Sequence, residues 1–261
     1  MSDRVLYVYA VTRDAVRPPH GEAVDCSSNF VTVQSSGVTA VATPVSATDF
    51  SQESIDSHAG DLEWLGAIGY RHQSVLAHLM RETAVVPLRA FSLFSSEDSL
   101  RRYLADNAVE LERMLERLDG KQEWTLRIEL DPQRFSDALT RRVDSLRSLA
   151  SEVETAAAGK AFLLRKKLEE AKKSASKKAE QQVVDEIERS VRDKLRCETV
   201  AESRQQRSGA FPQLNVLINR DEESRLQELQ IALNERYASE GVSVALTGPW
   251  PPYSFVGAMN G

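Results

Sequence analysis

The hydrophobic pattern of the first third of the chain changes from strand-like to helix-like near residue 60. Val5–Val11 is short and rich in β-branched and aromatic residues, which predicts a strand. Phe30–Gln34 and Val38–Ala42 are joined by two serines and a glycine, a pattern typical of a β-hairpin. From Leu62 to Leu79 apolar residues recur every three or four positions, which predicts an amphipathic helix.

A second strand-to-helix change follows, and it completes a first domain. Pro44 should end the second hairpin strand, and Val85–Phe94 predicts another strand with Pro87 at an edge or bulge. Ser95 and Asp98 resemble a capping box that opens one long helix. Its leucine stripe stops at Gly120. We therefore expect an N-terminal α+β domain over residues 1–118, a small sheet covered by helices.

The second half of the chain repeats this logic over residues 119–261. Trp124–Leu130 alternates strictly between apolar and polar residues, which predicts a half-buried strand. Asp131-Pro132 then predicts a helix start, with aspartate as cap and proline at the first helical position. Leu214–Ile218 and Val242–Leu246 predict two further strands on either side of a helix. This order resembles a ferredoxin-like plan with a greatly lengthened first connection, and we expect a parallel or mixed sheet.

The long connection, residues 132–207, predicts a helical arm. It contains no proline after Pro132, and its only glycine is Gly159. Apolar stripes on both sides of Gly159 predict an antiparallel helical hairpin that turns there. The second helix would span roughly 70 Å if wholly helical. Its apolar residues step by four, so the stripe winds around the helix, which favours a helix that bends or changes partner over a strict coiled coil.

The end of the chain, residues 247–256, combines prolines with aromatic residues. Its three prolines fix φ and remove backbone donors, so we expect no regular ladder or helix there. Trp250, Tyr253 and Phe255 can each bury a large apolar area. We call this segment the strap. It either docks on its own domain or binds a partner, as proline-rich segments do.

Composition and charge narrow the class of protein. The 261 residues are 41% hydrophobic with a formal net charge of −6, so we expect a packed core and no general attraction to nucleic acid or acidic lipid. No apolar run approaches the ~18 residues of a membrane span, and the N-terminus lacks a signal sequence pattern. Two cysteines far apart in sequence predict incidental thiols. These features predict a soluble cytosolic protein.

A basic run on the arm stands out against this acidic background. It holds two glutamates and eight basic residues: Lys160, Arg165, Lys166, Lys167, Lys172, Lys173, Lys177 and Lys178. Such a run is either a solvated helix face or a surface that binds RNA, anionic lipid or an acidic partner. Phe162 is its only aromatic residue, which weakens the case for single-stranded nucleic acid. Lys166, Lys167, Lys172 and Lys173 are the candidates for docking a protein.

For several single residues a structural role is the simplest prediction. Arg89 lies in an apolar strand and should form a buried salt bridge between sheet and helix. His72 and His78 are six apart on a helix, so we expect one in the core and one at the surface. Cys197 follows Arg196, which could lower its pKa, although a plain half-buried thiol is the simpler interpretation. Trp64 and Trp124 are expected to be structural.

Catalytic and cofactor motifs are missing from the sequence. No glycine-rich phosphate loop, GxSxG elbow or metal-ligand spacing occurs. We therefore predict no catalytic residue, no metal site and no cofactor, and a protein that is not an enzyme.

Five blocks of sequence, in order, resemble one known family. After an opening Tyr7-Val8-Tyr9-Ala10 they read LEWLGAIGYRHQSVLAHL from Leu62, VVPLRAFSLF from Val85, LDGKQEWTLRIEL from Leu118, GKAFLLRKK from Gly159 and LTGPWPPYSFV from Leu246. This series is similar to the gas vesicle protein L/F family (GvpL/GvpF) over nearly the whole chain. One departure occurs after Arg89, where the family usually reads Phe-Gly-Thr and this chain has Ala90-Phe91-Ser92.

The resemblance implies a non-enzymatic accessory or minor structural protein of gas vesicle assembly. Its implied partner is the small, hydrophobic main shell protein, with other accessory proteins as further partners and an association with the vesicle in the cytoplasm. It implies no cofactor, no nucleic acid and no membrane, and we expect a monomer when isolated. The alternative, from another class, is an RNA-binding or regulatory module that uses a ferredoxin-like sheet and the basic helix.

Overall fold

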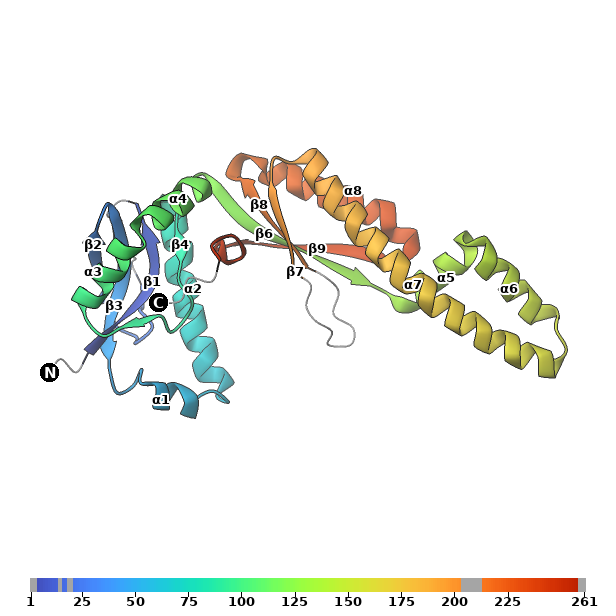
Figure 1. Cartoon of the computed structure of the whole chain (residues 1–261), viewed down its shortest axis with the longest axis horizontal. Helices are drawn as coiled ribbons and strands as arrows, with labels where there is room; N and C mark the ends of the chain where they lie inside the picture. Colours follow the sequence, from blue (N-terminus) through green and yellow to red (C-terminus); the bar gives the residue numbers. More distant parts are fainter. Residues whose placement is uncertain (1–3, 14–15, 18–20, 203–212, 258–261) are drawn as a thin grey trace. The chain divides into compact units, whose positions relative to one another are not determined.

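The computed structural model describes residues 4–13, 16–17, 21–202 and 213–257 (Figure 1). The chain forms two compact units, one made of Met1–Glu123 with Pro249–Gly261 and the other of Trp124–Gly248. The sequence placed the first boundary at residue 118 and assigned the strap to the C-terminal domain. The structure instead groups residues 249–257 with the first unit.

The sheet of the first unit is antiparallel and centred on β1, Arg4–Thr12. β1 lies between β3 (Val38–Ser46) and the short β4 (Val86–Pro87), and β2 (Val31–Ser35) forms the hairpin with β3. The prediction that Pro44 ends the hairpin strand is wrong, because β3 runs two residues further.

The predicted strand over residues 85–94 is two short strands. β4 ends at Pro87, and β5, Leu93–Phe94, pairs separately with β1. Between them Phe91 adopts a left-handed backbone with φ of 66°, which breaks the ladder. This interruption could not be read from β propensity, because the residue that turns the chain is itself a good strand former.

The described part of the first unit has four helices. They are α1 (Gln52–Ser57), α2 (Leu62–Glu82), α3 (Glu97–Asp106) and α4 (Ala108–Leu118), of which α2, α3 and α4 contact this sheet. The expected single helix over the leucine stripe is broken at Asn107, which caps both pieces. Its capping box is formed by Ser96 and Ser99, one residue later than the sequence indicated. Ser96 accepts from the Ser99 N–H, and Ser99 Oγ accepts from the Ser96 N–H.

The second unit contains a four-stranded antiparallel sheet in the order β7-β8-β6-β9. Its strands are β6 (Lys121–Leu130), β7 (Glu198–Glu202), β8 (Gln213–Asn219) and β9 (Val242–Trp250). The expected parallel or mixed arrangement is therefore wrong. The sequence predicts helical arm for the residues that form β7. β9 continues through Pro249 into the strap, although the prolines of the strap predict that it leaves the ladder.

The arm consists of three helices, α5 (Pro132–Arg142), α6 (Asp144–Thr155) and α7 (Ala158–Lys194) (Figure 1). α8 (Glu223–Tyr237) packs near the end of the arm that lies away from the turn between α6 and α7. Asp131 caps α5 through the Gln133 and Arg134 N–H groups, and Pro132 is its first residue, as predicted. The chain turns at Ala156 and Ala157, where the backbone is extended. Gly159 lies inside α7, so it is not the hinge.

α7 has 37 residues, or about 55 Å of helix, shorter than expected because β7 takes over the end of the run. Its first half packs on α5 and α6 and its second half contacts α8 and β7, so the helix changes partner along its length as its winding stripe indicates. The predicted arm ended at residue 207, and residues 203–207 lie outside the described part of the chain.

Candidate partner-binding surfaces

The strap is tied to the first unit through a buried histidine. His72 on α2 is 3% exposed and lies between two tyrosines. Its Nδ1 is 2.9 Å from the Tyr7 hydroxyl on β1, and its Nε2 is 3.0 Å from the Tyr253 hydroxyl of the strap. Tyr253 in turn donates to the Leu88 carbonyl at 3.2 Å. Side chains from β1, α2 and the strap, which are distant in sequence, are therefore linked in one series of hydrogen bonds.

The direction of this chain follows from the number of protons available. Because the Tyr253 hydroxyl has one proton and gives it to Leu88, it must accept from His72, which places the histidine proton on Nε2. Nδ1 is then free to accept from Tyr7. Every group is satisfied only while His72 is neutral. Burial favours the same state, because it lowers the pKa of His72 to about 4.

Two further contacts hold the short helical turn that follows, Tyr253–Phe255. The buried Glu123 carboxylate accepts from the Ser254 N–H at 3.1 Å and from its hydroxyl at 2.8 Å. Arg117 donates to the Phe255 carbonyl at 2.9 Å and lies 5.9 Å from the centre of the Phe255 ring. Phe255 itself is 4% exposed.

The three strap aromatics consequently divide into two kinds. Phe255 is buried and serves the fold, whereas Trp250 and Tyr253 are 41% and 36% exposed. The hydroxyl of Tyr253 is anchored, but part of its ring faces solvent. The strap thus docks on its own chain, and part of its aromatic surface stays exposed, so partner binding by Trp250 and Tyr253 remains a prediction.

The arm carries the second surface. Lys166, Lys167 and Lys173 are exposed on α7, but the side chain of Lys172 is only 22% exposed and lies 3.6 Å from Glu169. Two apolar side chains near the start of the helix, Phe162 and Leu163, are 68% and 67% exposed. From the sequence Phe162 stood out only as the aromatic residue of the basic run, and Leu163 did not stand out. The helical period could have found both, because they lie off the buried stripe.

The segment after β4 contains Arg89, whose predicted role is wrong, and Phe91, where the sequence departs from the family pattern. Arg89 is exposed, so the buried salt bridge expected for it is not there. Phe91 occupies the position where the family usually has glycine, and it keeps the left-handed backbone that glycine would adopt at no cost. Its ring stacks on Trp64 at 5.7 Å, and Trp64 stacks on His58 at 4.7 Å. This stack offsets the backbone strain.

Trp124 is 6% exposed in the core of the second unit, and its indole N–H has no hydrogen-bond partner among the residues that the structure describes. Because the ring is buried, it offers no face on which a nucleic-acid base could stack. Cys197 is a half-buried thiol, and burial together with the negative charge of Glu222 raises its pKa to about 11. The neighbouring arginine does not activate it.

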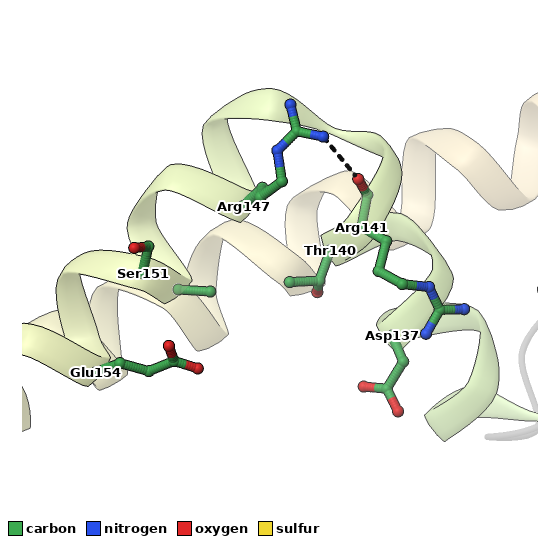
Figure 2. Close-up of a pocket in the computed structure, with 7 residues that line it drawn as sticks. Asp137, Thr140, Arg141, Arg147, Ser151 and Glu154 are labelled. Atoms are coloured by element: carbon green, nitrogen blue, oxygen red, sulfur yellow. Dashed lines mark hydrogen bonds between the residues drawn. The ribbon is translucent and has the colours of Figure 1, made fainter.

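A pocket of about 430 Å³ lies between α5 and α6 (Figure 2). Asp137 and Glu154 line it together with Arg141 and Arg147, so its formal charges balance. Arg147 is already engaged, since it donates to the Arg141 carbonyl at 3.3 Å and pairs with Asp144. The pocket offers polar groups but no net charge to select a ligand.

The described residues also lack the features of two other kinds of site. No cluster of three or more histidine, cysteine, aspartate or glutamate side chains there could hold a metal ion. Within the same described residues, no helix combines the length and the apolar character that crossing a bilayer requires.

These features define a mixed α and β protein whose distinctive surfaces are an anchored aromatic strap and a basic helical arm. Residues 5–257 match the model of the family described as gas vesicle synthesis protein GvpL/GvpF, so the chain belongs to that family. It is 31% identical over 267 residues to gas vesicle protein L of Streptomyces sp. (strain CB03234), covering 98% of this chain and 94% of that protein. Gas vesicle protein L2 of Halobacterium salinarum is 31% identical over 183 residues, 65% of this chain and 63% of that protein.

Solved structures show the same fold. The crystal structure of the gas vesicle protein GvpF from Anabaena sp. PCC7120 matches with a TM-score of 0.74 at 14% identity, over 97% of this chain and 98% of that one. GvpF from Microcystis aeruginosa matches with a TM-score of 0.67 over the same shares. The family resemblance predicted from the sequence blocks is confirmed, and it implicates the chain in gas vesicle assembly.

Proposed function

We propose that this chain is a non-enzymatic accessory protein of gas vesicle assembly that binds the hydrophobic main shell protein. The observation that carries the proposal is its family membership across residues 5–257. A shell subunit with exposed apolar surface needs a partner that covers it before assembly, because unpaired apolar faces and strand edges aggregate. The partly exposed aromatics of the strap and the apolar start of α7 are surfaces suited to that role.

The two surfaces would contribute differently. Trp250 offers a large ring at the end of β9, the kind of residue that dominates binding energy at interfaces. Lys166, Lys167 and Lys173 would act on the encounter rate, because exposed charges steer association and are screened by salt. No cofactor enters this scheme, and the protein would act in proportion to its amount, in association with the vesicle.

We also infer that the second unit is a ferredoxin-like domain with the arm inserted in its first connection. The strand order β7-β8-β6-β9 and the sequence of helices between the strands support this assignment. Under this scheme each of the two units folds as a domain of its own.

Co-expression with the main shell protein tests the proposed function. The amount of shell protein that stays soluble should rise with the amount of this chain and level off near a constant ratio. Affinity in the micromolar range is expected, because ordering costs offset much of the apolar burial. Protection by trace amounts, or turnover that needs a nucleotide, would contradict binding and favour an enzyme.

Variants separate the two surfaces in the same assay. Trp250→Ser should weaken binding about tenfold or more if the ring is an anchor. Changing Lys166, Lys167 and Lys173 together to glutamine should slow association, and salt of about 0.5 M should mimic this change. Ile231→Ser on α8 and a double change of Arg81 and Arg102 to glutamine are the matched controls, since these side chains are exposed elsewhere. Equal losses in the controls would point to a general effect.

A further inference from the structure

The start of α7 presents an apolar pair surrounded by positive charge. Phe162 and Leu163 are 68% and 67% exposed, more than any other large apolar side chain of the described arm. Residues four apart on a helix are neighbours, so Lys166 lies beside Phe162 and Lys167 beside Leu163. We call these four residues, with Lys160, the arm tip. Exposed aromatic and leucine side chains that are surrounded by charges of one sign are typical of a binding surface.

A groove on α2 of the first unit is a candidate site for such a surface. It has a volume of about 570 Å³ and is lined by Glu22, Gly66, Ala67, Tyr70, Arg71 and Ser74. A side-chain carbon added at Gly66 or Gly69 would meet nothing within 4 Å, so this helix face is open. Tyr70 is 76% exposed beside it, and Leu62, two turns earlier, is 83% exposed. Small residues next to large apolar ones let another helix approach closely.

The stretch of chain that leads into this groove is acidic, whereas the arm tip is basic. Residues 21–70 contain seven carboxylates and no lysine or arginine. Glu63 lies on the groove face, because it is three and four residues before Gly66 and Ala67. Among the described lining residues Arg71 is the one cation, and it is paired with Glu22 at 3.2 Å, so these two charges cancel and Glu63 supplies the negative charge on the groove face. The basic run over residues 160–178 holds eight cations and two carboxylates in a chain of net charge −6.

We propose that the arm tip of one copy docks in the α2 groove of a second copy. The two surfaces differ in sequence, shape and charge, so the contact is head-to-tail and leaves a free tip and a free groove on the pair. Growth by this contact forms open chains or closes into a ring. At low concentration the protein remains a monomer, as the sequence analysis expects, and self-association appears as concentration rises. Only this chain takes part, so the purified protein tests the contact without the shell protein, for which Lys166, Lys167 and the apolar start of α7 are also candidate contacts.

The purified full-length chain is the material for the first test. Its weight-average mass is measured by sedimentation or light scattering over about two decades of concentration. In salt of about 50 mM the mass should rise above the 29.1 kDa of one copy, and in about 500 mM salt it should fall back. A mass that stays at one copy under every condition overturns the proposal.

Complementary variants give the sharper test. The tip variant, Phe162→Ser with Leu163→Ser, and the groove variant, Gly66→Lys, should each associate about tenfold more weakly than the parent or not at all. Mixed in equal amounts, they should form pairs that grow no further, because the mixture contains one intact tip and one intact groove. Val109→Ser, at a residue 83% exposed on α4, is the matched control and should behave like the parent.

Three results would contradict the head-to-tail contact. The first is association of either variant alone as strongly as the parent, which indicates a symmetric or unrelated interface. The mixture could fail to form pairs although both variants are folded. Finally, the parent could stay monomeric while the tip variant alone loses binding to vesicles of anionic phospholipid, which would make the arm tip a lipid contact.

Discussion

The first unit and the helical arm show two ways in which one chain stabilises its helices. In the first unit, α2 packs through aromatic rings, a buried histidine and large aliphatic side chains on β1 and β3. The arm packs through leucines and valines interrupted by Ala171, Ala175 and Ala179, which bury little area. Its sequence is rich in alanine, lysine and glutamate, which favour helix without any partner. One region therefore depends on tertiary contacts and the other largely on local propensity.

The same leucine-to-alanine change should separate the two regions most strongly. Leu76→Ala, in a fully buried position of α2, should lower the free energy of unfolding by about 3–5 kcal/mol. Leu168→Ala, in a position of α7 that is 8% exposed, should cost only about 2 kcal/mol, the low end for such a change, because the thin arm can close part of the gap.

Chemical denaturation gives both values, and amide exchange locates each effect. Exchange should be fast between residues 166 and 182 even in the parent chain, since few large side chains protect that stretch of α7. Slow exchange throughout it, or equal costs for the two substitutions, would show that the arm is packed as tightly as the first unit.

Acid should affect the first unit before the arm. The pKa of His72 is about 4 in the folded chain against 6.5 when unfolded, so between these values the unfolded chain binds more protons. Stability from the neutral histidine is therefore complete above pH 6.5 and is lost as pH falls towards 4, by roughly 3 kcal/mol.

Thermal or urea unfolding of the first unit between pH 7 and 4 measures this loss. His72→Gln, which can hydrogen-bond but does not titrate, should be less stable at pH 7 and should show a flatter pH dependence. An unchanged slope in this variant would assign the acid sensitivity to other groups.

Phe91 offers a smaller test of how tertiary contacts overrule local preference. Phe91→Ala removes the ring that stacks on Trp64 and keeps a side chain at φ of 66°, whereas Phe91→Gly removes the ring and relieves the backbone. The alanine variant should therefore be less stable than the glycine variant by about 1 kcal/mol. In a helix alanine is more stabilising than glycine, so the order expected at Phe91 is the reverse. If the alanine variant is the more stable one, the backbone at Phe91 has rearranged.

Gly159 should give the smallest effect, with the opposite sign. It lies in the first turn of α7, and an added side-chain carbon would meet nothing within 4 Å. Gly159→Ala should stabilise the arm by about 0.5–1 kcal/mol, because alanine favours helix. The contrasting control is Gly241→Ala, where φ is 74° and the new carbon would lie 2.6 Å from the Arg134 Cβ. A destabilised Gly159→Ala would restore this glycine as the hinge of the hairpin.

The sequence by itself determined the features that depend on neighbours along the chain. The central strand, α2, the Asp131 cap and the winding stripe of α7 were predictable because side-chain period and capping are local properties. The family could be predicted for the same reason, since ordered motifs are read directly from the residues. Within the candidate surfaces, the basic face of α7 and the aromatic content of the strap were visible in this way.

Only the tertiary structure decided how distant segments share hydrogen bonds and burial. It assigned residues 249–257 to the first unit and joined His72 to both Tyr7 and Tyr253. It exposed Arg89 and placed Phe91 in a glycine-like backbone with its ring stacked on Trp64. The turn at Ala156 rather than Gly159 follows from the packing of α6 on α7, which sets where the chain must reverse. Such choices depend on partners far away in sequence, and no local pattern encodes them.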